Sequence, residues 1–227
     1  MMDKLCFLIP STSHMRNWNN IKESYLYESL KVVNEFYQGI TIFVFYEEDD
    51  ILYHNQIGWL EDLLPNLHFR FVLNYQSKIA KGNVVSMWNF LYEIAYKEKF
   101  DYFYIIGDDI SYPKNNVWLP RMIHKLRENN NLGFSAGDSG NPMLPMTQFL
   151  VSRKHYEIFN HAFNKLLVNW YCDNYMCELY PKKYINYFSD IKLINSGGTP
   201  RYIPKDHNRL YKLLVKRDRN ILKPHLK

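Results

Sequence analysis

The chain has 227 residues, 47% of them hydrophobic and 22% charged, which is typical of a globular protein with a sizeable core and argues against intrinsic disorder. Three cysteines are too few for a disulfide scaffold and lack zinc-finger spacing, so a reducing compartment fits best. No apolar run approaches the length of about 18 residues that a membrane-spanning helix needs, so we expect a cytoplasmic protein without a transmembrane segment.

The formal net charge of +5 is unevenly placed along the chain. Residues 201–227 contain nine Lys or Arg and two Asp, and the first 200 residues therefore carry about −2. A nucleic-acid-binding protein usually spreads its basic residues over one face of a domain. We therefore expect no nucleic-acid partner, and we expect one domain over residues 1–215 followed by a basic C-terminal extension over 216–227.

Strands and helices alternate along the first half of the chain, which indicates an α/β sheet. Short apolar runs predict buried strands at Leu5–Pro10, Ile40–Tyr46 and 100–106, and an alternating run predicts another at Leu67–Leu73. Apolar residues at helical spacing predict helices over 20–37 and 83–97.

The second half has shorter elements. We expect a helix over 118–126, strands over 132–136 and 147–151, and a helix after Ser152. A glycine-rich loop occupies 137–142. A short helix should follow residues 169–174, short strands should occupy 191–194 and 201–203, and His207 should open a last, basic helix.

An acidic pair, Asp108 and Asp109, follows Gly107 at the carboxyl end of the strand predicted over 100–106. Ligands of open α/β sheets bind outside the carboxyl ends of the strands. Two adjacent carboxylates repel each other unless water or a cation lies between them, and Mg²⁺ or Mn²⁺ takes oxygen ligands of this kind. The alternative is an Asp-Asp turn that caps the next segment.

Groups suited to a diphosphate follow the first predicted strand. Pro10, Ser11 and Thr12 end that strand, Arg16 lies close behind, and Lys81 precedes the helix over 83–97. Hydroxyls, free backbone N–H groups and a guanidinium can together hold phosphate oxygens. Alternatively, Arg16 and Lys81 are ordinary surface charges.

The order of these motifs resembles the GT-A fold glycosyltransferases. The resemblance is carried by Ile9-Pro10-Ser11-Thr12 at the end of the first strand, by Trp88-Asn89 in a helix, and by a DxD-like Gly107-Asp108-Asp109 after the next strand. Over roughly residues 4–215 the chain also resembles the small glycosyltransferases with which large DNA viruses such as chloroviruses decorate their capsid glycans. The resemblance implies a single-domain, Rossmann-like GT-A fold whose mixed, mainly parallel sheet is flanked by helices. For a viral chain it implies the host cytoplasm.

The resemblance also implies a metal and its ligands. Asp109 matches the residue that ligates the Mn²⁺ or Mg²⁺ bridging the donor diphosphate, Asp108 would support the metal or the ribose, and His207 matches a histidine that completes the metal shell. Gly107 stands where the family has its first acidic residue. This departure shifts the expected ribose contact toward Glu47 and its acidic neighbours at 48 and 49.

The activity that the resemblance implies is transfer of a hexose or deoxyhexose from a nucleotide sugar, a UDP-sugar, to a hydroxyl of a glycan or glycoprotein. We expect an inverting reaction with Asp173 as the general base and Asp138, in the glycine-rich loop, as the second choice. Arg201, Lys205 or Arg209 could add positive charge for the leaving diphosphate. The alternatives are a plain N-cap role for Asp173 and a surface histidine at 207.

Two other functions stay open at this stage. A nucleotidyltransferase that makes nucleotide sugars would also place acidic residues at strand ends, but its first loop is usually glycine-rich, and residues 11–14 contain no glycine. A non-catalytic carbohydrate-binding protein on the same fold would account for Gly107.

Overall fold

The computed structural model describes residues 4–75, 78–144, 146–197 and 201–226. Seven strands form its central sheet in the order β3-β2-β1-β4-β7-β6-β8. The strands are β1 (Leu5–Pro10), β2 (Ile40–Tyr46), β3 (Leu67–Leu73), β4 (Tyr102–Ile105), β6 (Phe134–Asp138), β7 (Phe149–Ser152) and β8 (Ile185–Lys192). Only β7 pairs antiparallel with its neighbours β4 and β6, so the expected mixed, mainly parallel sheet is confirmed.

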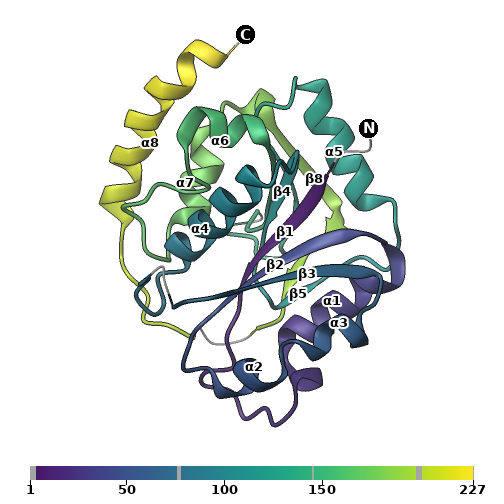
Figure 1. Ribbon diagram of the computed structural model, residues 1–227. Helices are drawn as coiled ribbons and strands as arrows, with labels where there is room; N and C mark the ends of the chain where they lie inside the picture. The colour runs from purple at the N-terminus through teal and green to yellow at the C-terminus, as the bar shows by residue number, and fades with distance from the viewer. Residues whose placement is uncertain (1–3, 76–77, 145, 198–200, 227) are drawn as a thin grey trace.

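Helices cover both faces of this sheet (Figure 1). One face carries α4 (Val84–Lys97), α6 (Arg153–Phe159), α7 (Cys172–Leu179) and α8 (Asn208–Leu222), and the other carries α1 (Tyr25–Phe36), α2 (Ile51–Gln56), α3 (Trp59–Leu63) and α5 (Trp118–Glu128). Successive strand residues point to opposite faces: in β1, Cys6 and Leu8 join one core and Phe7 and Ile9 join the other. A strand buried on both faces needs a continuous apolar run, which is why β1 and β2 coincide with the predicted segments.

A small second sheet pairs β5 (Ile110–Ser111) antiparallel with β9 (Ile194–Asn195). The Ser196 N–H donates to the Asp109 carbonyl over 2.8 Å, immediately beyond this pairing. Ser196 and Gly197 are thereby placed beside the acidic pair, although they lie far from it in the sequence.

Two predicted elements differ from the structure. The helix expected over 20–37 is divided into a short 3₁₀ turn (Ile21–Glu23) and α1, because Ser24 adopts an extended conformation and its side chain accepts from the Tyr27 N–H. Residues 201–203, expected as a strand, form no strand. Instead β8 is longer than the strand expected over 191–194 and begins at Ile185.

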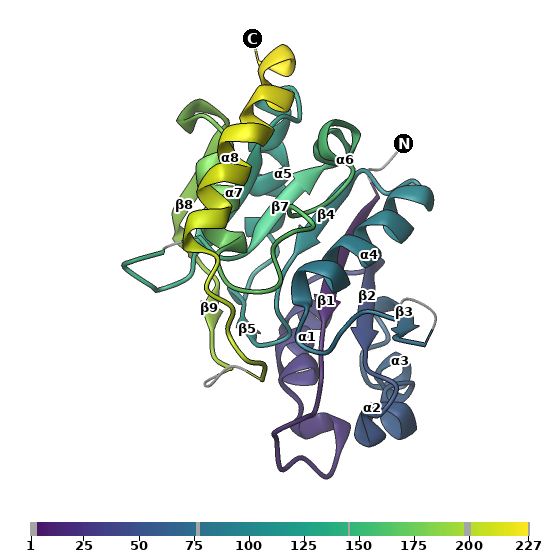
Figure 2. The same ribbon diagram turned by 90° about the vertical axis from the view of Figure 1, so that its left-hand side faces the viewer.

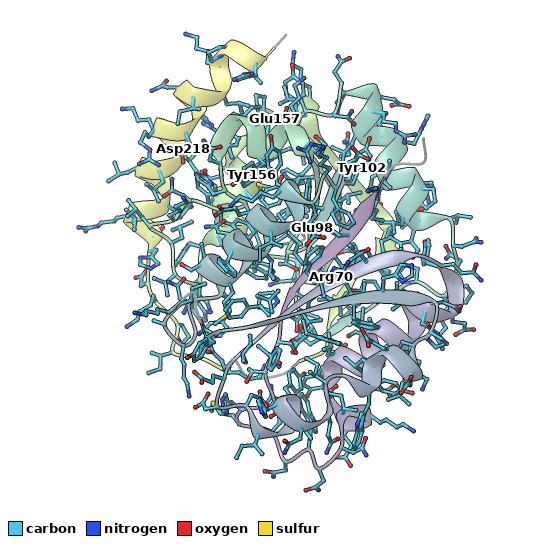
Figure 3. All side chains as sticks on the ribbon, in the orientation of Figure 1. Arg70, Glu98, Tyr102, Tyr156, Glu157 and Asp218 are labelled. Carbon is cyan, nitrogen blue, oxygen red and sulfur yellow. The ribbon has the colours of Figure 1, made fainter. Side chains whose placement is uncertain are left out.

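The basic extension expected from residue 216 onward begins inside α8, which is continuous from Asn208 to Leu222. Figure 2 shows α8 lying along α7. Asp218, labelled on α8 in Figure 3, is fully buried and accepts hydrogen bonds from Asn164 Nδ2 (2.6 Å), Tyr175 Oη (2.8 Å) and Arg217 Nε (2.8 Å). Residues 216–222 therefore belong to α8 and contact the core through Asp218 and Leu222. Within the described ranges, no helix is both long and apolar enough to span a bilayer.

Candidate functional site

Strands β1, β2, β4 and β6 run in the same direction, so their carboxyl ends meet at one edge of the sheet. Two adjoining cavities open at this edge. The smaller, of about 280 Å³, is lined by Pro10, Ser11, Thr12, His14, Met15, Phe45, Glu47, Lys81, Gly82, Val84, Met87, Arg201 and Tyr202. The larger, of about 600 Å³, extends past the acidic pair to α7, where Trp170, Cys172 and Asp173 line it. Pro10, Val84, Arg201 and Tyr202 line both cavities and mark their junction.

Asp108 is buried at this junction, with 1% of its surface exposed. Its Oδ2 accepts from Ser11 Oγ (2.5 Å) and from Arg201 Nη1 (2.6 Å), and its Oδ1 accepts from Arg201 Nη2. Ser11 in turn contacts Tyr53 Oη over 2.7 Å, and Ser29 Oγ donates to the Asp108 carbonyl. Both carboxylate oxygens of Asp108 are thus engaged by side chains of this chain.

The carboxylate of Asp109 lies between two glycines. A Cβ on Gly107 would lie 2.8 Å from Asp109 Oδ1, and a Cβ on Gly197 would overlap the same carboxyl group. A side chain at position 107 would therefore require the Asp109 carboxylate to shift. Burial, and next the charge of Asp108, raise the pKa of Asp109 to about 6, while Arg201 opposes this rise.

The Ser-Thr-Ser sequence after β1 is folded by Asp50, the last of the four acidic residues after β2. Asp50 is fully buried and accepts from Thr12 Oγ1 (2.9 Å), from Ser13 N (2.6 Å) and Oγ (2.5 Å), and from the Tyr53 N–H (3.1 Å), which it caps at the start of α2. The hydroxyls that we expected to face a diphosphate are therefore directed mainly at carboxylates of the protein. Ser11 and Thr12 still line the smaller cavity.

Glu47 contributes a buried carboxylate to the smaller cavity. Its Oε2 accepts from Asn74 Nδ2 over 2.7 Å, whereas its buried Oε1 has no hydrogen-bond partner among the described residues. Lys81 lines the same cavity and pairs with Asp49, both side chains being largely exposed. Arg16 lies near the acidic pair and donates from Nη2 to the Gly197 carbonyl (2.6 Å), and it lines neither cavity.

Asp173 is the carboxylate of the larger cavity at the start of α7. The N-cap of α7 is Tyr171, so the plain N-cap role considered for Asp173 is wrong. Burial raises the pKa of Asp173 to about 7 from its usual 3.8, and a weak hydrogen bond from Cys172 Sγ (3.8 Å) opposes the rise. A carboxylate with a pKa near neutrality is suited to accept a proton at physiological pH.

Asp138, the second candidate for the base, lies at the end of β6 and lines neither cavity. Its carboxylate pairs with Lys192 and accepts from the Gly140 N–H (2.9 Å), and the hydrogen bond from Lys192 lowers its pKa. The structure thus brings Asp173, and not Asp138, together with the acidic pair.

Residues that the sequence did not single out complete the larger cavity. Thr147 and Gln148 precede β7 and line it, and the buried Thr147 Oγ1 and Gln148 Oε1 lack hydrogen-bond partners among the described residues. Asn169, also buried, donates from Nδ2 to the carbonyls of Gly82 (3.2 Å) and Ile203 (3.1 Å) and accepts from the Lys205 N–H (2.9 Å). These hydrogen bonds of Asn169 connect the segment 201–205, which contains Arg201, to the loop before α4.

The structure does not place the two metal ligands that the resemblance implies in one cavity: Asp109 lines the larger cavity, and His207 does not. Asp108 is engaged on both oxygens, and His207 lines neither cavity and stands at the N-terminus of α8. Over 4–75, 78–144, 146–197 and 201–226, no group of three or more His, Cys, Asp or Glu side chains could hold a metal ion. Asp109 has a guanidinium, that of Arg201, 3.9 Å from its Oδ2.

Comparison with solved structures confirms the fold. Over 97% of its length the chain aligns with a cytidylyltransferase from Leptospira borgpetersenii serovar Hardjo-bovis, at 8% identity and a TM-score of 0.55, covering 97% of that protein. It aligns over the same share with GalNAc-T7, crystallised with UDP, GalNAc and Mn²⁺, at 8% identity and a TM-score of 0.56, and spans 48% of that chain. No family model and no curated protein matches the sequence. The mixed α/β fold is thus one on which both a nucleotidyltransferase and a glycosyltransferase are built, and the likeness to viral enzymes stays a prediction.

Proposed function

We propose that the chain is a glycosyltransferase that moves a sugar from a nucleotide sugar to a hydroxyl acceptor. The observation that carries this proposal is the pair of joined cavities at the carboxyl edge of the sheet, with Arg201 at their junction. A nucleotide sugar has the same division: a nucleoside and a sugar on either side of an anionic diphosphate.

The smaller cavity suits the nucleoside. Phe45, Val84 and Met87 offer apolar surface to a base, and the unpartnered Oε1 of Glu47 can accept from a ribose hydroxyl or a base N–H. The resemblance of the sequence implies uracil as the base, and we adopt UDP-sugars as the donor class.

The larger cavity suits a sugar and its acceptor. A buried oxygen without a hydrogen-bond partner lowers the stability of the folded state unless a ligand supplies a donor. Thr147 Oγ1 and Gln148 Oε1 are two such oxygens in the wall of the larger cavity. Trp170, half-exposed, adds an aromatic face of the kind on which a pyranose ring packs.

Asp173 acts as the general base in the proposed reaction. The acceptor oxygen attacks the anomeric carbon and gives its proton to the Asp173 carboxylate. The bond between the anomeric carbon and the diphosphate oxygen breaks, and its electron pair leaves with the nucleoside diphosphate. Attack from the face opposite the leaving group inverts the anomeric configuration, which is the outcome that we propose.

The test is release of the nucleotide (UDP, GDP or CMP) from a panel of UDP-, GDP- and CMP-sugars offered with simple glycosides as acceptors. We expect turnover with a UDP-sugar, lost in Asp173→Asn and retained in Glu178→Gln, a change on the exposed side of the same helix. Release of pyrophosphate from a nucleoside triphosphate and a sugar phosphate would instead identify a nucleotidyltransferase. Binding of glycans without any turnover would indicate a non-catalytic protein.

A further inference from the structure

At the junction of the two cavities, Asp108 forms an ion pair with Arg201, which lies 93 positions away in the sequence. Arg201 uses both terminal nitrogens on the two oxygens of Asp108, and its Nη1 also donates to the Thr12 carbonyl over 2.8 Å. A fork of this kind is the most directional and among the strongest charge-assisted contacts of a guanidinium. The orientation of Arg201 is therefore fixed before any ligand arrives.

The guanidinium of Arg201 stands between the two cavities, where the diphosphate of a nucleotide sugar would need a positive charge. Arg201 lines both cavities, its side chain is 13% exposed, and it lies 3.9 Å from Asp109 Oδ2. A ligand that fills both cavities must pass its diphosphate along this shared wall. Arg16 adds a second positive charge nearby, and both guanidiniums lie beside the ring of Tyr25, at 5.3 Å for Arg16 and 6.0 Å for Arg201.

A divalent cation would have to displace this arrangement. An ion on Asp109 would lie beside the guanidinium of Arg201, which is 3.9 Å from Asp109 Oδ2. To use Asp108 as well, the ion must separate this buried carboxylate from Arg201 and from Ser11 Oγ. Removing one member of a buried pair is strongly unfavourable. Asp108 is thus already occupied by an arginine, and Asp109 lies beside the same guanidinium.

Building on the proposed function, we propose that Arg201 takes the place of the metal ion, and that this chain binds and activates its nucleotide-sugar donor without a divalent cation. The guanidinium donates to the phosphate oxygens and its charge offsets the negative charge that builds up on the leaving diphosphate. No proton passes from it, because an arginine stays protonated in proteins. Asp108 is the positioning residue that orients Arg201.

The experiment is calorimetric titration of UDP into the full chain, first with EDTA and then with Mn²⁺ or Mg²⁺. We expect the same Kd in all three conditions. Arg201→Ala should weaken binding by about ten- to a hundredfold in EDTA, the range for a lost hydrogen bond to a charged group. Arg201→Lys should weaken it less, because the charge stays and the fork is lost. Arg70→Ala, an exposed arginine on β3 outside both cavities, is the matched control and should not change the Kd.

Two results would overturn this proposal while leaving the proposed function intact. One is binding of UDP that disappears in EDTA and returns with Mn²⁺ in the unmodified chain, a comparison that needs no variant to fold. The other is a folded Arg201→Ala protein, checked by circular dichroism, that binds UDP in EDTA as tightly as the unmodified chain. Absence of UDP binding under every condition would overturn both the donor class and this inference.

Discussion

Replacing Asp173 with asparagine should abolish transfer and stabilise the folded chain in the same variant. The amide has the shape of the carboxyl group but accepts no proton, so the acceptor hydroxyl loses its base. Removing a general base typically slows a reaction by about a hundredfold to ten-thousandfold. In the unmodified chain the rate should rise with pH and level off above about 7, because Asp173 must be ionised to act and its pKa is raised to about 7.

The stabilisation follows from the same burial. The pKa of Asp173 rises from a usual 3.8 to about 7 on folding, and this difference of about 3 corresponds to at most about 4 kcal/mol of unfolding free energy. Because the folded pKa is the higher one, the folded state binds the proton more tightly. The carboxyl group is therefore harmless below pH 3.8, costs stability increasingly as pH rises from there, and reaches its full cost above about pH 7.

Urea unfolding of both proteins across this pH range measures the effect. The asparagine variant should be the more stable at pH 8, and its advantage should shrink steadily toward pH 4. A stability difference that does not change with pH would refute the burial argument. A variant that transfers sugar at the normal rate would refute the catalytic role, and loss of activity in Asp138→Asn instead would move the role to that residue.

Three further predictions concern the walls of the site. Gly197→Ala should push a methyl group into the Asp109 carboxyl group and lower the free energy of unfolding by about 1–3 kcal/mol. We expect a lower urea midpoint of unfolding and weaker UDP binding, and an unchanged midpoint would contradict the glycine contact. Asn169→Ala should release the segment 201–205 and weaken UDP binding by about tenfold in titration calorimetry, whereas an unaltered Kd would show that Arg201 keeps its position without Asn169. Asp50→Ala should cost about 3 kcal/mol of unfolding free energy, because Thr12, Ser13 and the start of α2 lose one shared acceptor; a loss below about 1 kcal/mol would contradict that account.

The fold was largely readable from the sequence where a strand has an unbroken apolar run, as in β1 and β2, or a regular alternation, as in the edge strand β3. β1, β2 and β3 begin and end at the predicted residues, because an apolar or alternating run with polar residues at each end leaves little choice. β8 was missed over most of its length because Ile185–Lys192 is an edge strand with several exposed side chains, and its run contains Asn, Ser and Asp. The sequence of β7 does not indicate that this strand runs antiparallel to β4 and β6.

The site was readable only in part, for a different reason. The sequence placed the acidic pair, Glu47 and Asp173 after predicted strands or before a helix, and parallel strands bring such ends together. It offered Arg201, Lys205 and Arg209 as equal sources of charge, since nothing local distinguishes one basic residue before or at the start of a helix from another. The choice of Arg201 depends on Asn169 and Gly82, which fix the segment 201–205 across the cavities.

The metal ligands inferred from the resemblance depended on motif position alone. Asp109 and His207 match family positions in sequence order, yet His207 begins α8 and lines neither cavity. Whether a carboxylate is open to a metal depends on what already contacts it. Asp108 is already contacted by Ser11 and Arg201, which are distant from it in the sequence, so these contacts could not be predicted from the motif.

The most direct test of the central claim, that the joined cavities hold a nucleotide sugar, is the thermal unfolding midpoint with uridine, UDP and a series of UDP-sugars. A ligand that binds only the folded state raises the midpoint according to its occupancy. The two-cavity arrangement predicts a small rise with uridine, a larger rise with UDP as the diphosphate reaches Arg201, and the largest with the one UDP-sugar whose hydroxyls satisfy Thr147 and Gln148. Equal midpoints with all of these ligands and with none would contradict the assignment of both cavities.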